Sequence, residues 1–222
     1  MSPLDSQQGK CVARVVVVTI RILQGDTREV LTTLPDGSVQ CAVTSPPYFG
    51  LRQYLPDGHP DFDKQIGLES SPDEYVAELV AVFREVRRVL RDDGVVFLNL
   101  GDSYCATDKW GGGKSGNSGK HTIADDGSVP SWNVRARKPP MVGIKPKDLI
   151  GVPWMAAFAL RADGWWLRRD IIWAKPNPMP ESATDRPTTA HEYVFVLTKS
   201  AHYLWDAEAV REDATSDRPD MA

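Results

Sequence analysis

The chain has 222 residues with a formal net charge of −4, and 41% of them are hydrophobic and 25% are charged. This length suits one well-buried α/β domain and leaves little room for two, and the composition excludes a disordered or fibrous protein. No apolar run approaches the roughly 20 residues that a membrane helix needs, and the N-terminus lacks the pattern of a secretory signal. We therefore expect a cytoplasmic protein without membrane contact.

The ionisable residues give no sign of a metal centre and only a weak sign of nucleic-acid binding. Cys11, Cys41 and Cys105 show no Cys-x-x-Cys spacing, which argues against a zinc site and a disulfide scaffold. The histidines show no metal-ligand spacing either. The net charge is not the basic footprint of a dedicated nucleic-acid-binding module, although Lys and Arg recur over 135–175, where a local basic face can form.

The first 50 residues predict a β-α-β unit that ends in a proline-rich segment. The β-branched residues of 13–23 predict a strand, Asp26 or Thr27 can cap a helix over 28–34, and a turn then precedes a strand over 39–44. Such units imply a parallel sheet, whose ligand site lies beyond the carboxyl ends of its strands. Residues 45–48 follow directly after one of these ends.

The clearest helix of the sequence is predicted over 71–91. Ser71 suits the N-cap, Pro72 suits the first helical position, and Glu74 completes a capping box. Asp93-Gly94 is predicted to stop this helix. The apolar run 95–100 that follows is predicted to form a strand buried on both faces.

The second half of the chain begins with a long segment of different character. Residues 103–147 are rich in glycine and polar residues and predict a flexible insertion. The periodic pattern then predicts a helix over 148–162 and strands over 165–174 and 192–198. We expect one domain over 1–206 with a mostly parallel sheet, followed by a polar tail over 207–222. At least two of Trp165, Trp166 and Trp173 are expected in the core, because they lie in an apolar strand.

The segment Thr44-Ser45-Pro46-Pro47-Tyr48 carries the strongest chemical signal. Two prolines fix the backbone and remove two N–H donors, which leaves carbonyl oxygens as acceptors. The Ser45 hydroxyl oxygen and the Pro46 carbonyl can accept the two N–H bonds of an exocyclic base amine, which frees the nitrogen lone pair to attack an electrophilic methyl group. Tyr48 offers a face on which a base taken out of the duplex can stack. The alternative is a stiff turn after a core strand, with Tyr48 simply packed.

This segment resembles motif IV of the DNA N4-cytosine and N6-adenine methyltransferases, which are Rossmann-like enzymes that use S-adenosylmethionine. Other segments resemble the same family in its β-type order: Gly25-Asp26 upstream, residues 65–75 and 93–104 in the middle, and residues 173–182 and 191–195 downstream. The resemblance covers about residues 22–206. It implies a Rossmann-like S-adenosylmethionine-dependent methyltransferase fold that acts on double-stranded DNA, with 103–147 as a candidate target-recognition region.

The resemblance also implies roles for individual residues. Ser45, Pro46, Pro47 and Tyr48 are catalytic candidates, Asp26, Thr44 and Asp102 are candidates for cofactor binding, and Lys175, Pro176, Asn177 and Pro178 are candidates for lining the target-base pocket. For Asp26 the alternative is a helix N-cap, and for Asp102 it is an acidic residue in a turn after a strand. A Ser at the first position of motif IV favours cytosine over adenine as the target, although a hydroxyl suffices for either base.

One segment that the resemblance implies is missing. A β-type enzyme carries a glycine-rich cofactor loop of the Asp-Pro-Phe-x-Gly-x-Gly kind after the region matched here, and the sequence contains none. We therefore expect a truncated or split protein that needs a missing C-terminal segment or a second chain. The alternative is that the cofactor is held in an atypical way. The rival hypotheses are a catalytically silent DNA-binding remnant or partner subunit, and a methyltransferase that acts on RNA or protein.

Overall fold

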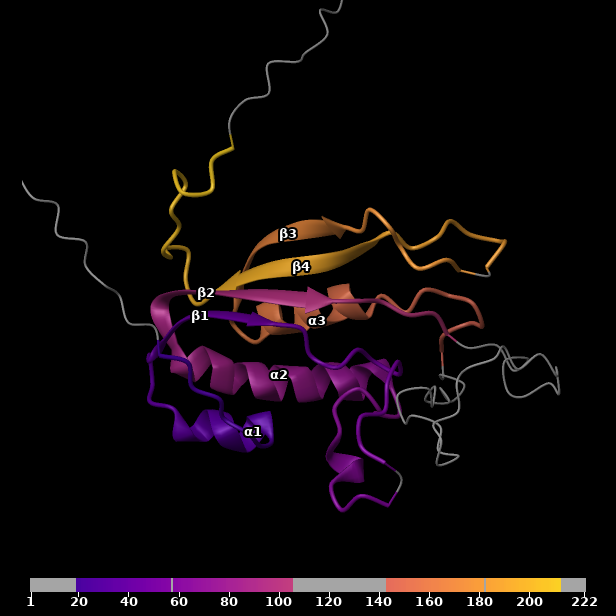
Figure 1. Cartoon of the computed structure of the whole chain (residues 1–222), viewed down its shortest axis with the longest axis horizontal. Coiled ribbons are helices and arrows are strands. Elements are labelled where there is room, and N and C mark those ends of the chain that lie inside the picture. Colours follow the sequence, from indigo (N-terminus) through magenta and orange to yellow (C-terminus); the bar gives the residue numbers. More distant parts are fainter. Residues whose placement is uncertain (1–18, 57, 106–142, 182, 213–222) are drawn as a thin grey trace, which may run out of the picture.

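The computed structural model describes residues 19–56, 58–105, 143–181 and 183–212. Its helices are α1 (Thr27–Val30), α2 (Pro72–Val89) and α3 (Val152–Ala162), with 3₁₀ turns at Leu31–Thr33 and Phe62–Lys64, and its strands are β1 (Val39–Thr44), β2 (Leu90–Leu100), β3 (Trp166–Ala174) and β4 (His191–Thr198). The four strands form one sheet (Figure 1). The predicted α/β class is confirmed for these residues.

The strand order of the sheet is β1-β2-β4-β3. β1 pairs with β2 in parallel, and β4 runs antiparallel to both β2 and β3. β1, β2 and β3 therefore point the same way and β4 is reversed (Figure 1). The described sheet is thus mixed, with one parallel and two antiparallel pairings, and the expected parallel pairing holds for its first two strands. The described residues of the connection from β3 to β4 form no helix. Neighbouring strands joined without a crossover are antiparallel, which explains the reversal.

The core lies between one face of this sheet and the helices α2 and α3. Val96, Leu98 and Leu100, which alternate along β2, are fully buried on that face, as the period-two geometry of a strand requires. They join α2 and α3 in one cluster that includes Phe83 and Leu160. The opposite face is more open, since Val43 on β1 is 79% exposed. The prediction that 95–100 is buried on both faces is therefore wrong: Val95, Phe97 and Asn99 are only partly buried.

The start of α2 follows the prediction with one difference. The Ser71 hydroxyl oxygen accepts the backbone N–H of Glu74 at 3.2 Å, as an N-cap does. The Glu74 carboxylate, however, accepts the backbone N–H of Ser70 at 3.1 Å. The reciprocal bond of the expected capping box therefore goes to the residue before the N-cap.

The end of α2 differs from the prediction. The helix ends at Val89 and β2 begins at once at Leu90, so Gly94 lies inside the strand. The register between β1 and β2 shifts at this point. A Cβ on Gly94 would come within 2.8 Å of the carbonyl oxygen of Gln40. The glycine therefore permits the close approach of two strands instead of stopping the helix.

Two further expectations are corrected. Residues 13–18 of the predicted first strand lie outside the described residues, and residues 19–23 form no strand because no described strand pairs with them. Among the three tryptophans only Trp165 is in the core, whereas Trp166 and Trp173 are 48% and 55% exposed. Their strand, β3, is at the edge of the described sheet, so it has less of the core to contact than β2 and β4.

The predicted helix over 28–34 is shorter and tighter than expected, because α1 gives way after Val30 to the 3₁₀ turn Leu31–Thr33. Among the described helices, none combines the length and the apolar character needed to cross a membrane.

Candidate active site at the end of the sheet

The proline-rich loop leaves the carboxyl end of β1 and is held against α2. The Tyr75 hydroxyl of α2 donates to the carbonyl oxygen of Pro47 at 2.8 Å, and the Tyr75 ring packs on buried Phe49 with ring centroids 5.5 Å apart. Gly67 lies close by at a φ of +101°, and a Cβ there would be 3.1 Å from the Tyr48 carbonyl oxygen. The loop is therefore fixed by packing as well as by its two prolines.

Tyr48 is fixed at both ends of its side chain. Its ring lies against Gly101, where a Cβ would come within 2.6 Å of the ring carbon Cε2. Its hydroxyl lies 2.7 Å from Asn99 Oδ1 and 3.1 Å from Glu192 Oε2, and it donates its single proton to one of these two acceptors. The ring is therefore set in one orientation at the end of β2.

Ser45 and Lys175 meet the same group of side chains. Ser45 Oγ lies 3.2 Å from both the Tyr48 hydroxyl and Asn99 Oδ1. The Lys175 amine forms an ion pair with Oε1 of Glu192. The structure thus brings together three predicted site residues, from the motif loop and from the segment after β3, through Asn99 and Glu192.

The charges of this group affect one another. The pKa of Tyr48 lies above its ordinary value, first because of burial and then because of the negative charge of Glu192, while the hydrogen bond from Ser45 acts in the opposite direction. Burial also acts to raise the pKa of Glu192, but hydrogen bonds from Lys175, Asn99 and Tyr48 outweigh it and the net pKa is lowered. At neutral pH the group therefore holds a carboxylate and a protonated phenol.

Asn99 and Glu192 lie within the family-like segments but were assigned no role from the sequence. Each could have been noticed in the sequence as a polar residue in or next to an apolar strand. Asn99 interrupts the apolar run 95–100, and Glu192 comes just before the run 193–197. Which side chains they contact depends on the pairing of β2 with β4, and the sequence does not give that pairing.

The remaining pocket candidates follow Lys175 on the connection between β3 and β4. Pro176 and Asn177 are exposed and Pro178 is partly buried. The two ends of this connection are held together, since the backbone N–H of Lys175 donates to the carbonyl of Ala190 at 2.8 Å. Their role in binding a base stays a prediction.

The candidates for cofactor binding are engaged within the chain. Asp26 caps α1 by accepting the backbone N–H of Arg28 at 2.9 Å, and the side-chain hydrogen bond from Arg28 lowers the pKa of Asp26. Asp102 accepts the backbone N–H groups of Ser103, Gly151 and Val152. These contacts fit the alternative roles given above, a helix cap for Asp26 and an acidic turn residue for Asp102. Thr44 ends β1 beside the motif loop.

We expect Asp102→Ala to destabilise the protein by about 1–3 kcal/mol, because it leaves partly buried backbone N–H groups at the start of α3 without an acceptor. Asp102→Asn keeps one acceptor oxygen and should cost less. Urea unfolding measures both changes. A stability unchanged in Asp102→Ala would contradict the capping role and favour a role in cofactor binding.

The ends of the 103–147 insertion pair with each other next to the site. The backbone of Cys105 donates to Asp148 at 2.9 Å and that of Ile150 to Ser103 at 2.9 Å, which is why α3 begins at Val152 and not at the predicted 148. Residues 106–142 lie outside the described residues. The base of the insertion contacts the β3–β4 connection, because the Arg186 guanidinium lies 3.8 Å from the centroid of the Tyr104 ring.

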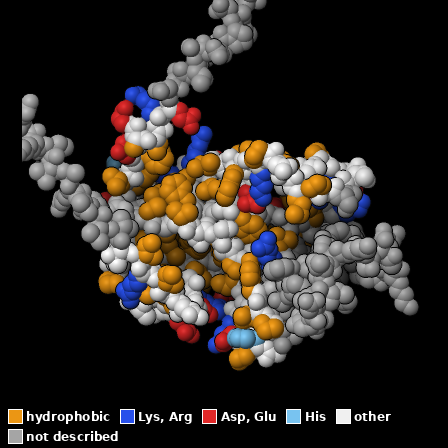
Figure 2. Space-filling model, viewed as in Figure 1, with side chains coloured by type: hydrophobic (Ala, Val, Ile, Leu, Met, Phe, Trp, Pro, Cys, Tyr) orange, Lys and Arg blue, Asp and Glu red, His pale blue; other side chains and the backbone are white. Residues whose placement is uncertain are grey.

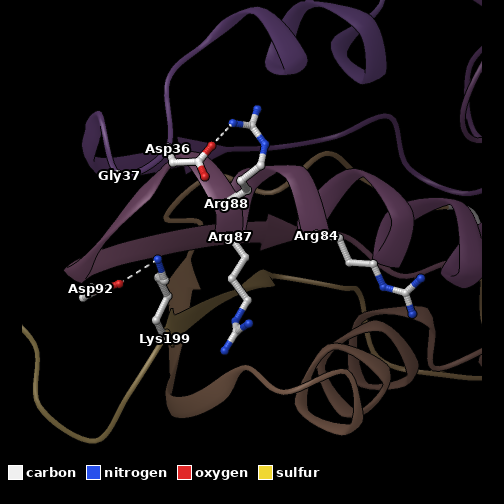
Figure 3. A pocket seen from close by; sticks show the side chains of 7 residues that line it. All are labelled: Asp36, Gly37, Arg84, Arg87, Arg88, Asp92 and Lys199. Carbon is white, nitrogen blue, oxygen red and sulfur yellow. Dashed lines mark hydrogen bonds and ion pairs between the residues drawn. The ribbon is translucent and has the colours of Figure 1, made fainter.

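A hollow lies away from the predicted site residues. It has a volume of about 490 Å³ and is lined by Asp36, Gly37, Arg84, Arg87, Arg88, Asp92 and Lys199. Figure 3 shows Arg88 turned towards Asp36 and Lys199 towards Asp92, and both pairs are ion pairs. Arg84 is paired with Asp163. The pairs of Arg84 and Arg88 join α2 to neighbouring segments, and the pair of Lys199 with Asp92 joins the end of β4 to β2. Nowhere in the described part of the chain do three metal-ligating side chains come together.

Comparisons with known proteins agree with the resemblance. The chain is 50% identical to the type II methyltransferase M.Cfr9I of Citrobacter freundii over 88% of its own length and 59% of that protein. It is 46% identical to M.SmaI of Serratia marcescens, over 90% of this chain and 63% of that protein. The chain thus spans about three fifths of the length of these relatives.

Two solved structures are similar at lower identity. One is a putative DNA modification methylase from Thermus thermophilus in complex with S-adenosyl-L-methionine, with 23% identity and a TM-score of 0.48 over 83% of this chain and 55% of that one. The other is the cytosine-N4-specific PvuII DNA methyltransferase, with 17% identity and a TM-score of 0.49 over 81% of this chain and 49% of that one. The family model N6_N4_Mtase, described as DNA methylase, matches residues 39–220, and the chain therefore belongs to this DNA methylase family.

Proposed function

We propose that this chain carries the base-binding part of a DNA methyltransferase that moves a methyl group from S-adenosylmethionine to the exocyclic amine of a flipped base. The observation that supports this proposal best is the arrangement of Ser45 and Tyr48 at the carboxyl end of β1, where Tyr75 holds the loop and Asn99 and Glu192 hold Tyr48. Double-stranded DNA is the proposed partner, and the cytoplasm is the proposed location.

The proposed chemistry of the site compensates for the weak nucleophilicity of the base amine. Its nitrogen lone pair is delocalised into the ring, so it is a poor nucleophile. Ser45 Oγ and the Pro46 carbonyl are proposed to accept its two N–H bonds and thereby to localise the lone pair on nitrogen. The Pro47 carbonyl is already engaged with Tyr75. Tyr48 is proposed to stack on the base, and such contacts contribute about 1–3 kcal/mol per base.

We propose N4 of cytosine as the acceptor, because a hydroxyl stands at position 45, and N6 of adenine as the alternative. Methylated DNA digested to nucleosides and analysed by mass spectrometry separates the two. N4-methylcytosine is the expected product, and N6-methyladenine alone would overturn the choice of base while leaving the transfer itself in place.

We infer that the described residues form only part of the cofactor site. The carboxylates of Asp26 and Asp102 accept hydrogen bonds from the chain itself, and the sequence contains no glycine-rich cofactor loop. We propose that the cofactor is held partly by a segment outside these 222 residues, either downstream in the same protein or in a second chain. The greater length of the relatives supports this, as do the hydrophobic side chains exposed over the sheet in Figure 2.

Calorimetry with S-adenosylmethionine tests this proposal. We expect weak binding by the chain alone, and tight binding together with methyl transfer once a segment with the glycine loop is supplied, joined or separate. If S-adenosylmethionine binding stays weak after such a segment is supplied, the result would instead support the hypothesis that the chain is a catalytically silent remnant or partner subunit. The DNA that follows the codon for Ala222 in the source gene shows directly whether that segment is encoded there.

The acceptor polymer is tested by competition. With labelled cofactor, duplex DNA is expected to take up methyl groups in preference to RNA and to peptides. Preferential labelling of RNA or peptide would mean that the motif loop activates an amine of RNA or protein instead of DNA.

A further inference from the structure

Glu192 occupies a junction between two parts of the candidate site. It is the second residue of β4 and pairs with Trp173 near the end of β3, while Asn99 of β2 pairs with Val194 two residues further along β4. Residues two apart on a strand share a face, so Glu192 lies on the same face of the sheet as Val194. This places its carboxylate between the motif loop that follows β1 and the segment that follows β3.

Each oxygen of this carboxylate meets a different predicted site residue. Oε2 lies within hydrogen-bond distance of the Tyr48 hydroxyl, at 3.1 Å, and Oε1 accepts from the Lys175 amine. The Glu192 side chain is 18% exposed, whereas that of Lys175 is 40% exposed. The Glu192 side chain is therefore the more shielded of the two, and the Lys175 side chain is the more exposed.

We propose that Glu192 is a positioning residue that holds the Tyr48 ring and the Lys175 amine at a fixed separation, so that the aromatic face and the cation of the base pocket are in place before DNA binds. This inference rests on the proposed function. Glu192 itself does not contact the reacting amine in this scheme. It acts through Tyr48, whose ring stacks on the base, and through Lys175, whose charge faces the substrate.

A carboxylate is suited to this task. An ionised carboxylate has two acceptor oxygens and a negative charge, so it can accept from a phenol and neutralise an ammonium group at the same time. A glutamine has a single acceptor oxygen, and its NH₂ group cannot accept from Lys175. Glu192→Gln is therefore expected to keep only one of the two contacts, and Glu192→Ala to lose both.

The contact with Tyr48 can be measured without any methyl transfer. Tyrosine labelled with ¹³C at Cζ gives one NMR signal for each tyrosine, and the Tyr48→Phe variant identifies the signal of Tyr48. Removing the negative charge with Glu192→Gln should lower the pKa of Tyr48, because that charge disfavours the phenolate. Tyr54 and Tyr75, which also interact with Tyr48, are unchanged in this variant. Lys175 loses its ion-pair partner, and an unpaired positive charge nearby favours the phenolate, so it acts in the same direction.

The positioning role itself is tested by kinetics on duplex DNA, with the chain supplied with the cofactor segment where it needs one. Because a small misplacement can cost up to about 100-fold, Glu192→Ala is expected to lower kcat by about 10- to 100-fold with little change in the KM for the cofactor. Glu192→Gln should recover part of this loss. Glu85→Ala is the matched control, since it removes a carboxylate paired with Arg88 on α2, and it should leave kcat unchanged.

A double-mutant cycle decides whether Glu192 acts through Tyr48. In the Tyr48→Phe background the loss caused by Glu192→Ala should be smaller than in the wild type, because one of its two partners is already gone. Equal losses in both backgrounds would overturn the inference, and so would a kcat that Glu192→Ala leaves intact in an active protein. If the wild type transfers no methyl group to DNA, whether or not the cofactor segment is supplied, the proposed function is contradicted. The inference about Glu192 is then contradicted as well, because it rests on that function.

Discussion

Ser45→Ala is expected to lower the rate of methyl transfer by about 100- to 1,000-fold, the usual loss when one preorganised polar partner of a transition state is removed. The hydroxyl oxygen is proposed to accept an N–H of the base amine as the nitrogen becomes tetrahedral, and alanine has no acceptor at this place. Ser45 is exposed, so the change should leave folding stability almost unaltered. A single-turnover assay with labelled cofactor measures the chemical step directly.

Ser38→Ala is the matched control for this change. The Ser38 hydroxyl is also exposed and donates to the carbonyl of Pro35 at 2.6 Å, before β1 and away from the motif loop. Its loss should leave the rate within about twofold, because surface changes of this kind have small effects. If Ser45→Ala behaved like Ser38→Ala in an active protein, the hydroxyl would have no part in activating the amine.

Elements whose signals are local could be predicted well from the sequence. The strand over 39–44 and the start of α2 at Ser71 and Pro72 both agree with the structure, because turn residues and caps act within a few positions. The motif loop was located for the same reason, since two adjacent prolines restrict the backbone wherever they occur.

Features that depend on distant partners could not be predicted in this way. In the sequence, Gly94 looks like the end of a helix. In the structure, a glycine is needed at this position because Gln40 of another strand approaches closely. Trp166 and Trp173 are hydrophobic wherever they lie, but their exposure follows from the place of β3 at the edge of the described sheet. A strand order is set by long-range pairing, which local patterns do not encode.

The same reasoning explains which part of the candidate site was missed. Ser45 and Tyr48 lie within one short motif, whereas Asn99 and Glu192 reach them across separations of 54 and 144 residues. Only the pairing of β2 with β4 brings these two polar side chains to one place. The reactive residues of the loop can thus be found from one short stretch of sequence. The hydrogen bonds that orient them depend on how the strands of the sheet pair.

Tyr75→Ala is expected to destabilise the protein by about 3–5 kcal/mol, the usual range for truncating a fully buried aromatic side chain. Tyr75 is 0% exposed, and its ring supports Phe49 while its hydroxyl binds the Pro47 carbonyl at 2.8 Å. Burial raises the pKa of Tyr75, so the hydroxyl stays protonated and remains a donor at neutral pH. Urea unfolding monitored by circular dichroism measures the loss.

Tyr75→Phe separates the hydroxyl from the ring. It keeps the packing and removes one hydrogen bond, which leaves the Pro47 carbonyl without this partner and should cost about 1–3 kcal/mol. Because that bond ties the motif loop to α2, methyl transfer should also fall in Tyr75→Phe at temperatures where the variant is fully folded. This second effect distinguishes a residue that fixes the loop from one that only fills the core.

Phe83→Ala provides the comparison that decides between these two roles. Phe83 is also on α2 and 2% exposed, but its described ring contact is with Trp165, at a centroid distance of 6.3 Å, and not with the motif loop. Its loss of stability should match that of Tyr75→Ala, again about 3–5 kcal/mol, while its rate per folded molecule should stay near that of the wild type. Equal rates per folded molecule in Tyr75→Ala and Phe83→Ala would mean that α2 stabilises the domain without holding the loop in its active geometry.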